Sequence, residues 1–164
     1  MLLPPIVAGL LSQFASSQMK ALLVSLAGVF LTIIVGCHAI VRTFADGRFF
    51  AFSDWLFLDE LSAYHLAVML FVFGFSSIFS LVYFGEEIRE KKLSLIQART
   101  FAGLWGPAMA AMLLVLVSNN MGIMWVGMEA TTLLTSFLVC MHVSRESLEA
   151  TWKYMLICSV GIGF

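Results

Sequence analysis

Long apolar stretches that are almost free of charged side chains dominate this chain of 164 residues. Four of them are residues 21–44, 62–84, 101–119 and 121–143. A helix needs about 20 predominantly apolar residues to cross the hydrocarbon core of a bilayer, and all four stretches meet that requirement. Only 12% of the residues are charged, against about 25% in an ordinary soluble domain. The chain is therefore predicted to be an integral membrane protein.

Two further apolar runs lie at the ends of the chain. Residues 2–14 are short for a span, but Pro4 and Pro5 suit the first turn of a helix, where their missing N–H groups cost little. A signal peptide is disfavoured because no Lys or Arg precedes this run. The last run opens near Ala150 and stops at Phe164. We predict an all-α, polytopic transmembrane helix bundle of five spans plus a truncated sixth, and we expect the chain to be a fragment.

The polar breaks between the runs predict an orientation, because cytoplasmic loops carry an excess of Lys and Arg. Alternate breaks hold seven of these residues, and the opposite set holds two. The seven are Lys20, Arg89, Lys91, Lys92, Arg99, Arg145 and Lys153, and the two are Arg42 and Arg48. We therefore predict that the N-terminus is outside and that the seven-charge side is cytoplasmic.

Individual breaks carry further signals. Residues 45–61 mix aromatic and acidic side chains, so they are predicted to lie along the outer interface with Trp55 as an anchor. Residues 85–100 are predicted to be a solvated loop, with Glu87 and Lys91 at a helical pairing distance. The break at residues 118–120 is so short that the spans on either side of it must be antiparallel neighbours.

Of the ten Asp and Glu residues, nine lie in polar breaks, and Glu129 alone lies inside an apolar stretch. A charged side chain at the centre of a membrane helix costs about 2.5–3.5 kcal/mol on insertion scales. Such a group is tolerated where it faces a protein interior, a water-filled cavity or a cation, and it usually handles protons or ions. Thr132 and Ser136 share its helix face. The alternative is a protonated carboxyl that only bonds a neighbouring helix.

Three other side chains are candidates for proton transfer. Lys153 follows Ser147, a predicted N-cap, and either reaches the cytoplasmic interface or lines an inward path toward Glu129. His65 and His38 lie toward the outer ends of their stretches. Each is a possible relay residue, although a lone histidine is more often a packing or interface residue.

Other classes of function are disfavoured by the sequence. A net charge of −1 gives no basic surface for nucleic acid. Cys37, Cys140 and Cys158 are an odd set without C-x-x-C spacing, so a disulfide framework, a structural zinc site and a cysteine-bound redox cofactor are not expected. No G-x-S-x-G motif is present for an intramembrane hydrolase. No metal, no bound cofactor and no catalytic centre are predicted in this chain.

Two segments carry a resemblance to a known family. SNNMGIMWVGMEATTLLTSFL at residues 118–138 and SLEATWKYMLICSVG at residues 147–161 closely resemble the antiporter-like membrane subunit of group 4 nickel–iron hydrogenases, called hydrogenase-4 component F. WLFLDELS at residues 55–62 is similar to the family's loop before its third helix. Relatives of that subunit occur in respiratory complex I and in multisubunit sodium/proton antiporters. The resemblance spans essentially the whole chain, and residues 1–164 would be the N-terminal part of such a domain.

The resemblance implies a proton path. These subunits have about fourteen helices, with two inverted five-helix repeats around broken helices. The family's glutamate on the fifth helix matches Glu129, and it pairs with a lysine on a seventh helix. The family's lysine early in the sixth helix matches Lys153. The implied setting is a bacterial or archaeal cell (inner) membrane, with other membrane and peripheral subunits of an oxidoreductase complex as partners.

The sequence leaves three hypotheses. The first is a proton-translocating subunit of a membrane-bound hydrogenase or formate hydrogenlyase-type complex, which couples electron transfer to transport of H⁺ or Na⁺. The second is a truncated, transport-inactive membrane scaffold or gene remnant. The third is a subunit of the complex I or multisubunit antiporter type.

Overall fold

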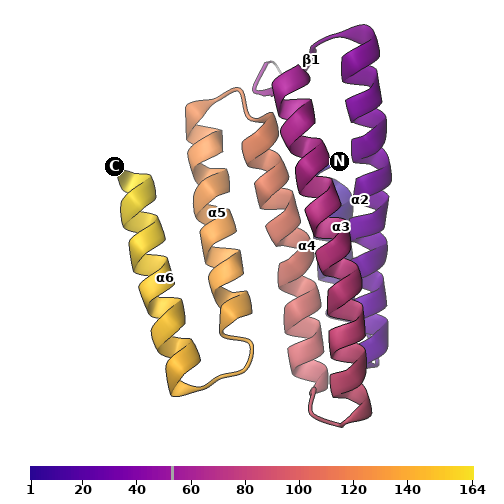
Figure 1. Ribbon diagram of the computed structural model, residues 1–164, viewed down its shortest axis with the longest axis vertical. Helices are drawn as coiled ribbons and strands as arrows, with labels where there is room; N and C mark the ends of the chain where they lie inside the picture. The colour runs from indigo at the N-terminus through magenta and orange to yellow at the C-terminus, as the bar shows by residue number, and fades with distance from the viewer. Residues whose placement is uncertain (53) are drawn as a thin grey trace.

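The computed structural model describes residues 1–52 and 54–164 and, of Phe49, the backbone. These residues form six helices and one small hairpin, which confirms the all-α prediction (Figure 1). The elements are α1 (Leu3–Ser12), α2 (Gln18–Asp46), β1 (Phe49–Ala51), β2 (Leu56–Leu58), α3 (Glu60–Arg89), α4 (Leu95–Val117), α5 (Met121–Val139) and α6 (Arg145–Gly163). The first four helices form one group, and α5 and α6 continue from α4 as a row.

Four of the helices in the described residues, α2, α3, α4 and α5, are long and apolar enough to cross a bilayer. The prediction of five spans plus a truncated sixth was therefore wrong in its count. Helix α1 has 10 residues, or about 15 Å of rise, which is half the thickness of the hydrocarbon core. Helix α6 has 19 residues but carries four charges in its first half: Arg145, Glu146, Glu149 and Lys153.

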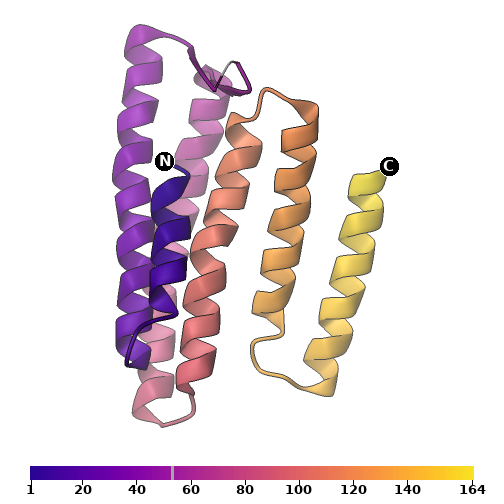
Figure 2. The same ribbon diagram turned by 180° about the vertical axis from the view of Figure 1, so that it is seen from behind.

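Helix α1 packs closely against α2 and α4 through residues without large side chains (Figure 2). A Cβ atom added at Gly28 of α2 would lie 2.2 Å from the Cβ of Ala8. One added at Gly106 of α4 would lie 2.2 Å from the carbonyl oxygen of Pro5. The short first helix is thus built into the bundle, although it does not reach across it.

The β1–β2 hairpin covers the end of the bundle where α4 turns into α5. Its antiparallel register pairs Phe50 with Phe57. The Asn119 backbone N–H donates to the Trp55 carbonyl at 2.9 Å, and the Asn119 side-chain amide donates to the Asp54 carbonyl at 2.8 Å. The hairpin is therefore tied to the short α4–α5 connection. Helices α4 and α5 pack against each other as antiparallel neighbours, as the shortness of that connection predicts.

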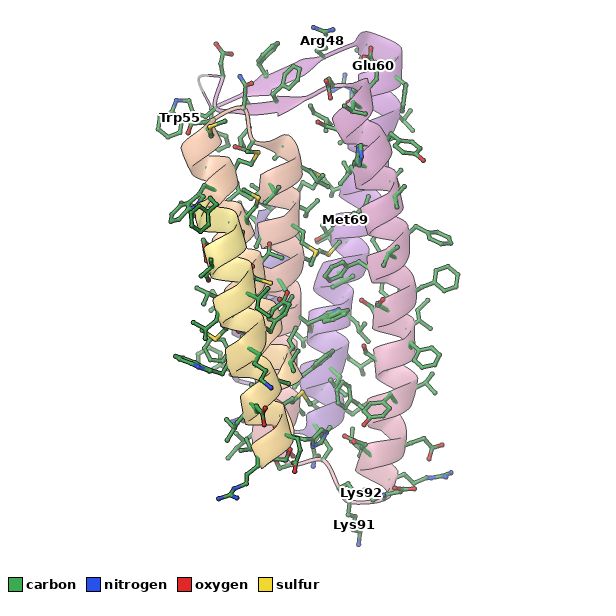
Figure 3. The ribbon with its side chains drawn as sticks, turned by 60° about the vertical axis from the view of Figure 1, so that its left-hand side comes forward. Arg48, Trp55, Glu60, Met69, Lys91 and Lys92 are labelled. Atoms are coloured by element: carbon green, nitrogen blue, oxygen red, sulfur yellow. The ribbon has the colours of Figure 1, made fainter. Side chains whose placement is uncertain are left out.

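The two ends of the bundle carry different charges. Figure 3 shows Arg48, Trp55 and Glu60 at one end and Lys91 and Lys92 at the other. The connections that precede α2, α4 and α6 all lie at the Lys91 end (Figure 2), and these connections and adjacent helix turns hold the seven cations of the larger set. The predicted orientation relative to the membrane follows from this grouping but stays a prediction.

The predicted pairing of Glu87 with Lys91 was wrong. Helix α3 ends at Arg89, and Lys91 follows it with a positive φ of 58°. A residue in that conformation no longer continues the helix, so its side chain does not lie over the preceding turn. Glu87 instead lies 3.4 Å from His142, in the connection between α5 and α6.

Replacing Asp59 with Ala is expected to destabilise the start of α3 by about 0.5–2 kcal/mol, the usual worth of an N-cap. The Asp59 carboxylate accepts from the Ser62 backbone N–H at 2.8 Å, and this bond lowers the pKa of Asp59 below its ordinary value. Because the folded-state pKa is depressed, the contribution is complete above the unfolded pKa of about 3.9 and is lost as the pH falls through the folded value. Thermal unfolding in detergent at neutral and acidic pH checks this, because the two proteins should converge in acid.

Candidate functional site

Glu129 lies near the middle of α5. It is the ninth of the nineteen residues of Met121–Val139, or about 12 Å from the start of the helix along its axis. Its side chain is half-buried. The Asn120 side chain caps the helix by accepting from the backbone N–H groups of Gly122 and Ile123. The capped start of α5 fixes the bounds of the helix, and the Glu129 carboxylate therefore lies near the middle of its length.

Ser159 of α6 is the hydrogen-bond partner of Glu129. Its Oγ donates to Glu129 Oε2 at 3.2 Å. A second bond between the same helices joins Thr135 Oγ1 to the Tyr154 hydroxyl at 3.1 Å. Both pairs fit one antiparallel register of α5 against α6. The carboxylate is thus directed to the α5–α6 interface, and no ion pair involving Glu129 is found among the described residues.

The hydroxyl groups of α5 that follow Glu129 in the sequence form hydrogen bonds within α5 itself. Thr131, Thr132 and Ser136 each donate to a carbonyl three or four residues earlier on α5. Thr132 and Ser136 are buried, as the predicted polar face requires. Their hydroxyl protons are therefore engaged by α5 itself, and Ser159 is the hydrogen-bond donor that Glu129 has among the described residues.

A groove of about 630 Å³ runs between α3, α4 and α5 and contains one of the predicted relay residues. His65 lines it together with Met128, Thr131 and Thr132 of α5, whereas Glu129 is not among its lining residues. The Nδ1 atom of His65 lies 2.9 Å from the Leu61 carbonyl oxygen. Since a carbonyl only accepts, this contact places the proton on Nδ1 and leaves Nε2 for other partners. The structure thus brings His65 to the same groove as the Glu129 segment.

Lys153 does not meet Glu129 in this structure. It forms an ion pair with Glu149, one turn earlier on α6, and its side chain is 65% exposed. Among the described residues of α6, Tyr154 and Ser159 hydrogen-bond α5, and Thr151, one turn before Tyr154, is buried. Lys153 is one position from Tyr154, or about 100° around the helix. It is also about 9 Å from Ser159 along the axis. Lys153 therefore lies outside the α5-facing stripe.

The remaining sequence-predicted features fall elsewhere. His38 and Cys37 are exposed on α2, and His38 does not line the His65 groove. The predicted N-cap of the last helix, Ser147, was wrong by three residues. Ser144 is the N-cap, and its side chain and that of Ser147 form a reciprocal capping box. Helix α6 consequently begins at Arg145, five residues before its apolar run.

One curated relative aligns with this chain over nearly all of its length. It is the "Hydrogenase-4 component F homolog" of Methylacidiphilum infernorum (isolate V4), which is 33% identical over 153 residues, or 93% of this chain. The chain is hydrogenase-4 component F-like. It spans 31% of the length of that relative. No family model matches the chain, and no solved structure matches it significantly.

Two residues of the Glu129 site were missed by sequence reasoning. Ser159 and Tyr154 both lie in the segment of closest resemblance, but neither is charged and neither was singled out. The spacing gives only a partial signal: Thr151, Tyr154 and Cys158 recur every three or four residues and so form one face of α6, and Ser159 follows directly after Cys158. That face identifies the side of α6 that turns toward Glu129.

Replacing Ser159 with Ala is expected to weaken the α5–α6 contact modestly. Hydrogen bonds between membrane helices average about 0.6 kcal/mol, with a maximum near 1.7. We therefore expect a small loss of unfolding free energy, measured by denaturant titration in micelles. Val160→Ala, on the exposed side of the same helix, is the control. A loss several times larger than that of the control, yet below about 2 kcal/mol, matches the geometry, and equal losses contradict it.

Proposed function

We propose that this chain forms part of a proton-translocating membrane subunit of a hydrogenase or formate hydrogenlyase-type oxidoreductase complex. The observation that carries the proposal is Glu129, a half-buried carboxyl at mid-depth of an apolar helix whose hydrogen bond comes from a neutral hydroxyl. An acid in that place is costly and is normally retained for handling protons or ions. The likeness to a hydrogenase-4 component F homolog supports the choice of complex.

In this proposal Glu129 accepts and releases the transported proton. Ser159 positions its carboxyl group, and the Ser159 donor stabilises the ionised form of a carboxylate. His65, which lines the groove beside Met128 and Thr132 of the same α5 segment, serves as a relay toward the end of the bundle that carries the hairpin. Each of these groups can hold a proton at a defined atom: Glu129 at Oε2 or Oε1, and His65 at Nε2.

In this proposal Lys153 does not line a direct path to Glu129, which was one of the two sequence-based expectations for it. Its side chain lies on the exposed side of α6 with Glu149, Leu156 and Val160. We propose that this side of α6 meets further helices of the subunit, so that Lys153 exchanges protons with groups there. Among the described residues His38 has no hydrogen bond or ion pair that supports a relay role, and its relay role remains a sequence-based prediction. Partner subunits, and H⁺ in preference to Na⁺, are part of the same proposal.

A transport-inactive scaffold is the second candidate, favoured by the fact that Glu129 has a hydroxyl partner but no cationic one among the described residues. A protonated glutamate bonded to Ser159 would serve that role. The two functions separate when Glu129→Gln is introduced into the full-length subunit of the assembled complex. The proposal requires that proton pumping is lost while hydrogenase activity and subunit assembly persist, and a scaffold requires that pumping is unchanged.

A further inference from the structure

The end of the bundle opposite the hairpin holds an acid that the proposed proton path does not use. The Glu87 side chain, on the last turn of α3, is only 13% exposed. Its Oε2 atom is buried and has no hydrogen-bond partner among the described residues. A buried carboxylate oxygen without a partner is costly, so this acid depends on whatever its second oxygen contacts.

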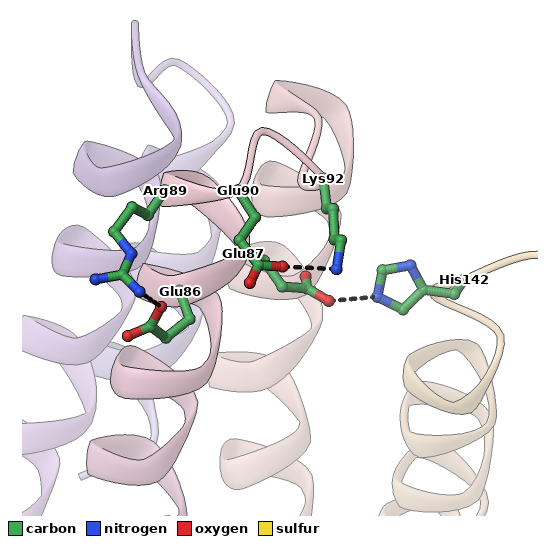
Figure 4. A network of polar contacts seen from close by, with 6 residues as sticks. All are labelled: Glu86, Glu87, Arg89, Glu90, Lys92 and His142. Carbon is green, nitrogen blue, oxygen red and sulfur yellow. Dashed lines mark ion pairs between the residues drawn. The ribbon is translucent and has the colours of Figure 1, made fainter.

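That contact is His142. The Glu87 Oε1 atom lies 3.4 Å from His142 Nε2, and the imidazole is 52% exposed (Figure 4). Neighbouring charges are paired elsewhere: Arg89 lies 2.8 Å from Glu86, and Lys92 lies 2.6 Å from Glu90. On α3 the Tyr83 hydroxyl also hydrogen-bonds the Glu87 carboxylate. The other charged groups at this end are Lys91 in the turn, Arg145 and Glu146 at the start of α6, Lys20, which bonds Ser16, and Arg99, which bonds the Ala15 carbonyl.

His142 also connects two parts of the chain. Its ring contacts α3, while its backbone carbonyl accepts from Ser147 Oγ at 2.8 Å in the first turn of α6. The same Ser147 hydroxyl belongs to the capping box that starts α6. Just before His142 in the sequence, Leu138 and Met141 pack against the apolar cluster that includes Phe84 and Phe101. His142 therefore links the end of α3, through its ring, to the first turn of α6, through its backbone carbonyl.

We propose that Glu87 and His142 form a proton-controlled latch that fixes the α5–α6 connection to the end of α3. An imidazole ordinarily changes its charge between about pH 5 and pH 8. With the ring protonated, the contact joins a cation to a carboxylate whose other oxygen is unpartnered, and the latch is closed. With the ring neutral, a largely buried carboxylate faces a group without charge, and the connection is released. This latch is independent of the role proposed for Glu129.

Hydrogen exchange of residues 140–147 in the full chain, reconstituted in nanodiscs, tests the latch at about pH 5.5 and about pH 8. After correction for the intrinsic rates, we expect exchange to be about tenfold slower at the lower pH, the ratio that one hydrogen bond to a charged group supplies. Glu87→Gln and His142→Asn should each remove the difference. Glu86→Gln, which removes the neighbouring acid in sequence, paired with Arg89, should keep it.

A permanently charged substitute separates a latch from a merely structural contact. His142→Arg should give slow exchange at both pH values, because arginine stays protonated throughout. The proposal is overturned if the wild-type chain shows no pH difference, if Glu87→Gln retains it, or if Glu86→Gln abolishes it. Circular dichroism of each variant establishes that the helices are intact, and a variant that has lost helix is replaced by the other member of the pair.

Discussion

Proton transport by the assembled complex is expected to fall to the background level when Glu129 is replaced by Gln. The amide keeps the shape of the carboxyl group, and its oxygen still accepts a hydrogen bond from the Ser159 hydroxyl, now 3.2 Å from the carboxylate. What is lost is the ability to bind and release a proton. Positioned acid–base groups typically contribute about 10²–10⁴-fold to a rate, so a loss of at least about a hundredfold is expected.

The measurement is proton uptake into vesicles that contain the purified complex, driven by its own electron-transfer reaction. Hydrogenase activity in the same vesicles reports whether the complex is assembled. Glu90→Gln is the matched control, because it removes an exposed acid whose partner is Lys92. Transport by Glu129→Gln within about twofold of the wild-type rate would be far short of an acid–base contribution and would favour the scaffold.

Replacing Gly106 with Val is expected to destabilise the bundle more than any other single change considered. The first added atom would lie 2.2 Å from the Pro5 carbonyl oxygen and 3.0 Å from the Pro5 carbonyl carbon. These are backbone atoms of α1, so they do not move aside as the end of a flexible side chain would. Overpacking of a core typically costs about 1–3 kcal/mol and occasionally more, and we expect the upper end of that range or beyond.

Thermal unfolding in detergent measures this effect. A loss of about 3 kcal/mol corresponds to a decrease in Tm on the order of 10 °C for a chain of this size. Gly85→Val is the matched control, because Gly85 is also inside a helix and has nothing within 4 Å of an added Cβ. Equal Tm values for the two variants would show that α1 is not packed against α4 as described.

The apolar stretches predicted the long helices well because a bilayer span leaves a strong, local signal. Residues 62–84 and 101–119 fall within or close to α3 and α4, and the short break at 118–120 correctly made α4 and α5 antiparallel neighbours. The count of spans failed at both ends of the chain. Hydropathy alone did not show that α1 has only 10 residues, nor that α6 starts in a charged segment.

The candidate site was predictable only in part. Glu129 stood out because a lone acid in an apolar helix is conspicuous in sequence. The direction in which the Lys153 side chain points was not predictable, because it depends on which side of α6 faces α5. Single hydrogen bonds, such as that of Ser159 with Glu129, decide which side this is. The contact of Glu87 with His142 joins residues 55 positions apart, a separation at which helical periodicity carries no information.

The central claim is that the Glu129 carboxyl exchanges its proton with water although it lies at mid-depth of a membrane helix. Infrared difference spectroscopy of the reconstituted full-length subunit tests this directly. The account predicts a protonated-carboxyl band that changes with pH, shifts in deuterated water and is absent from the Glu129→Gln variant. A Glu129 band that is insensitive to both pH and deuterium, or no difference between the two proteins, would contradict the account.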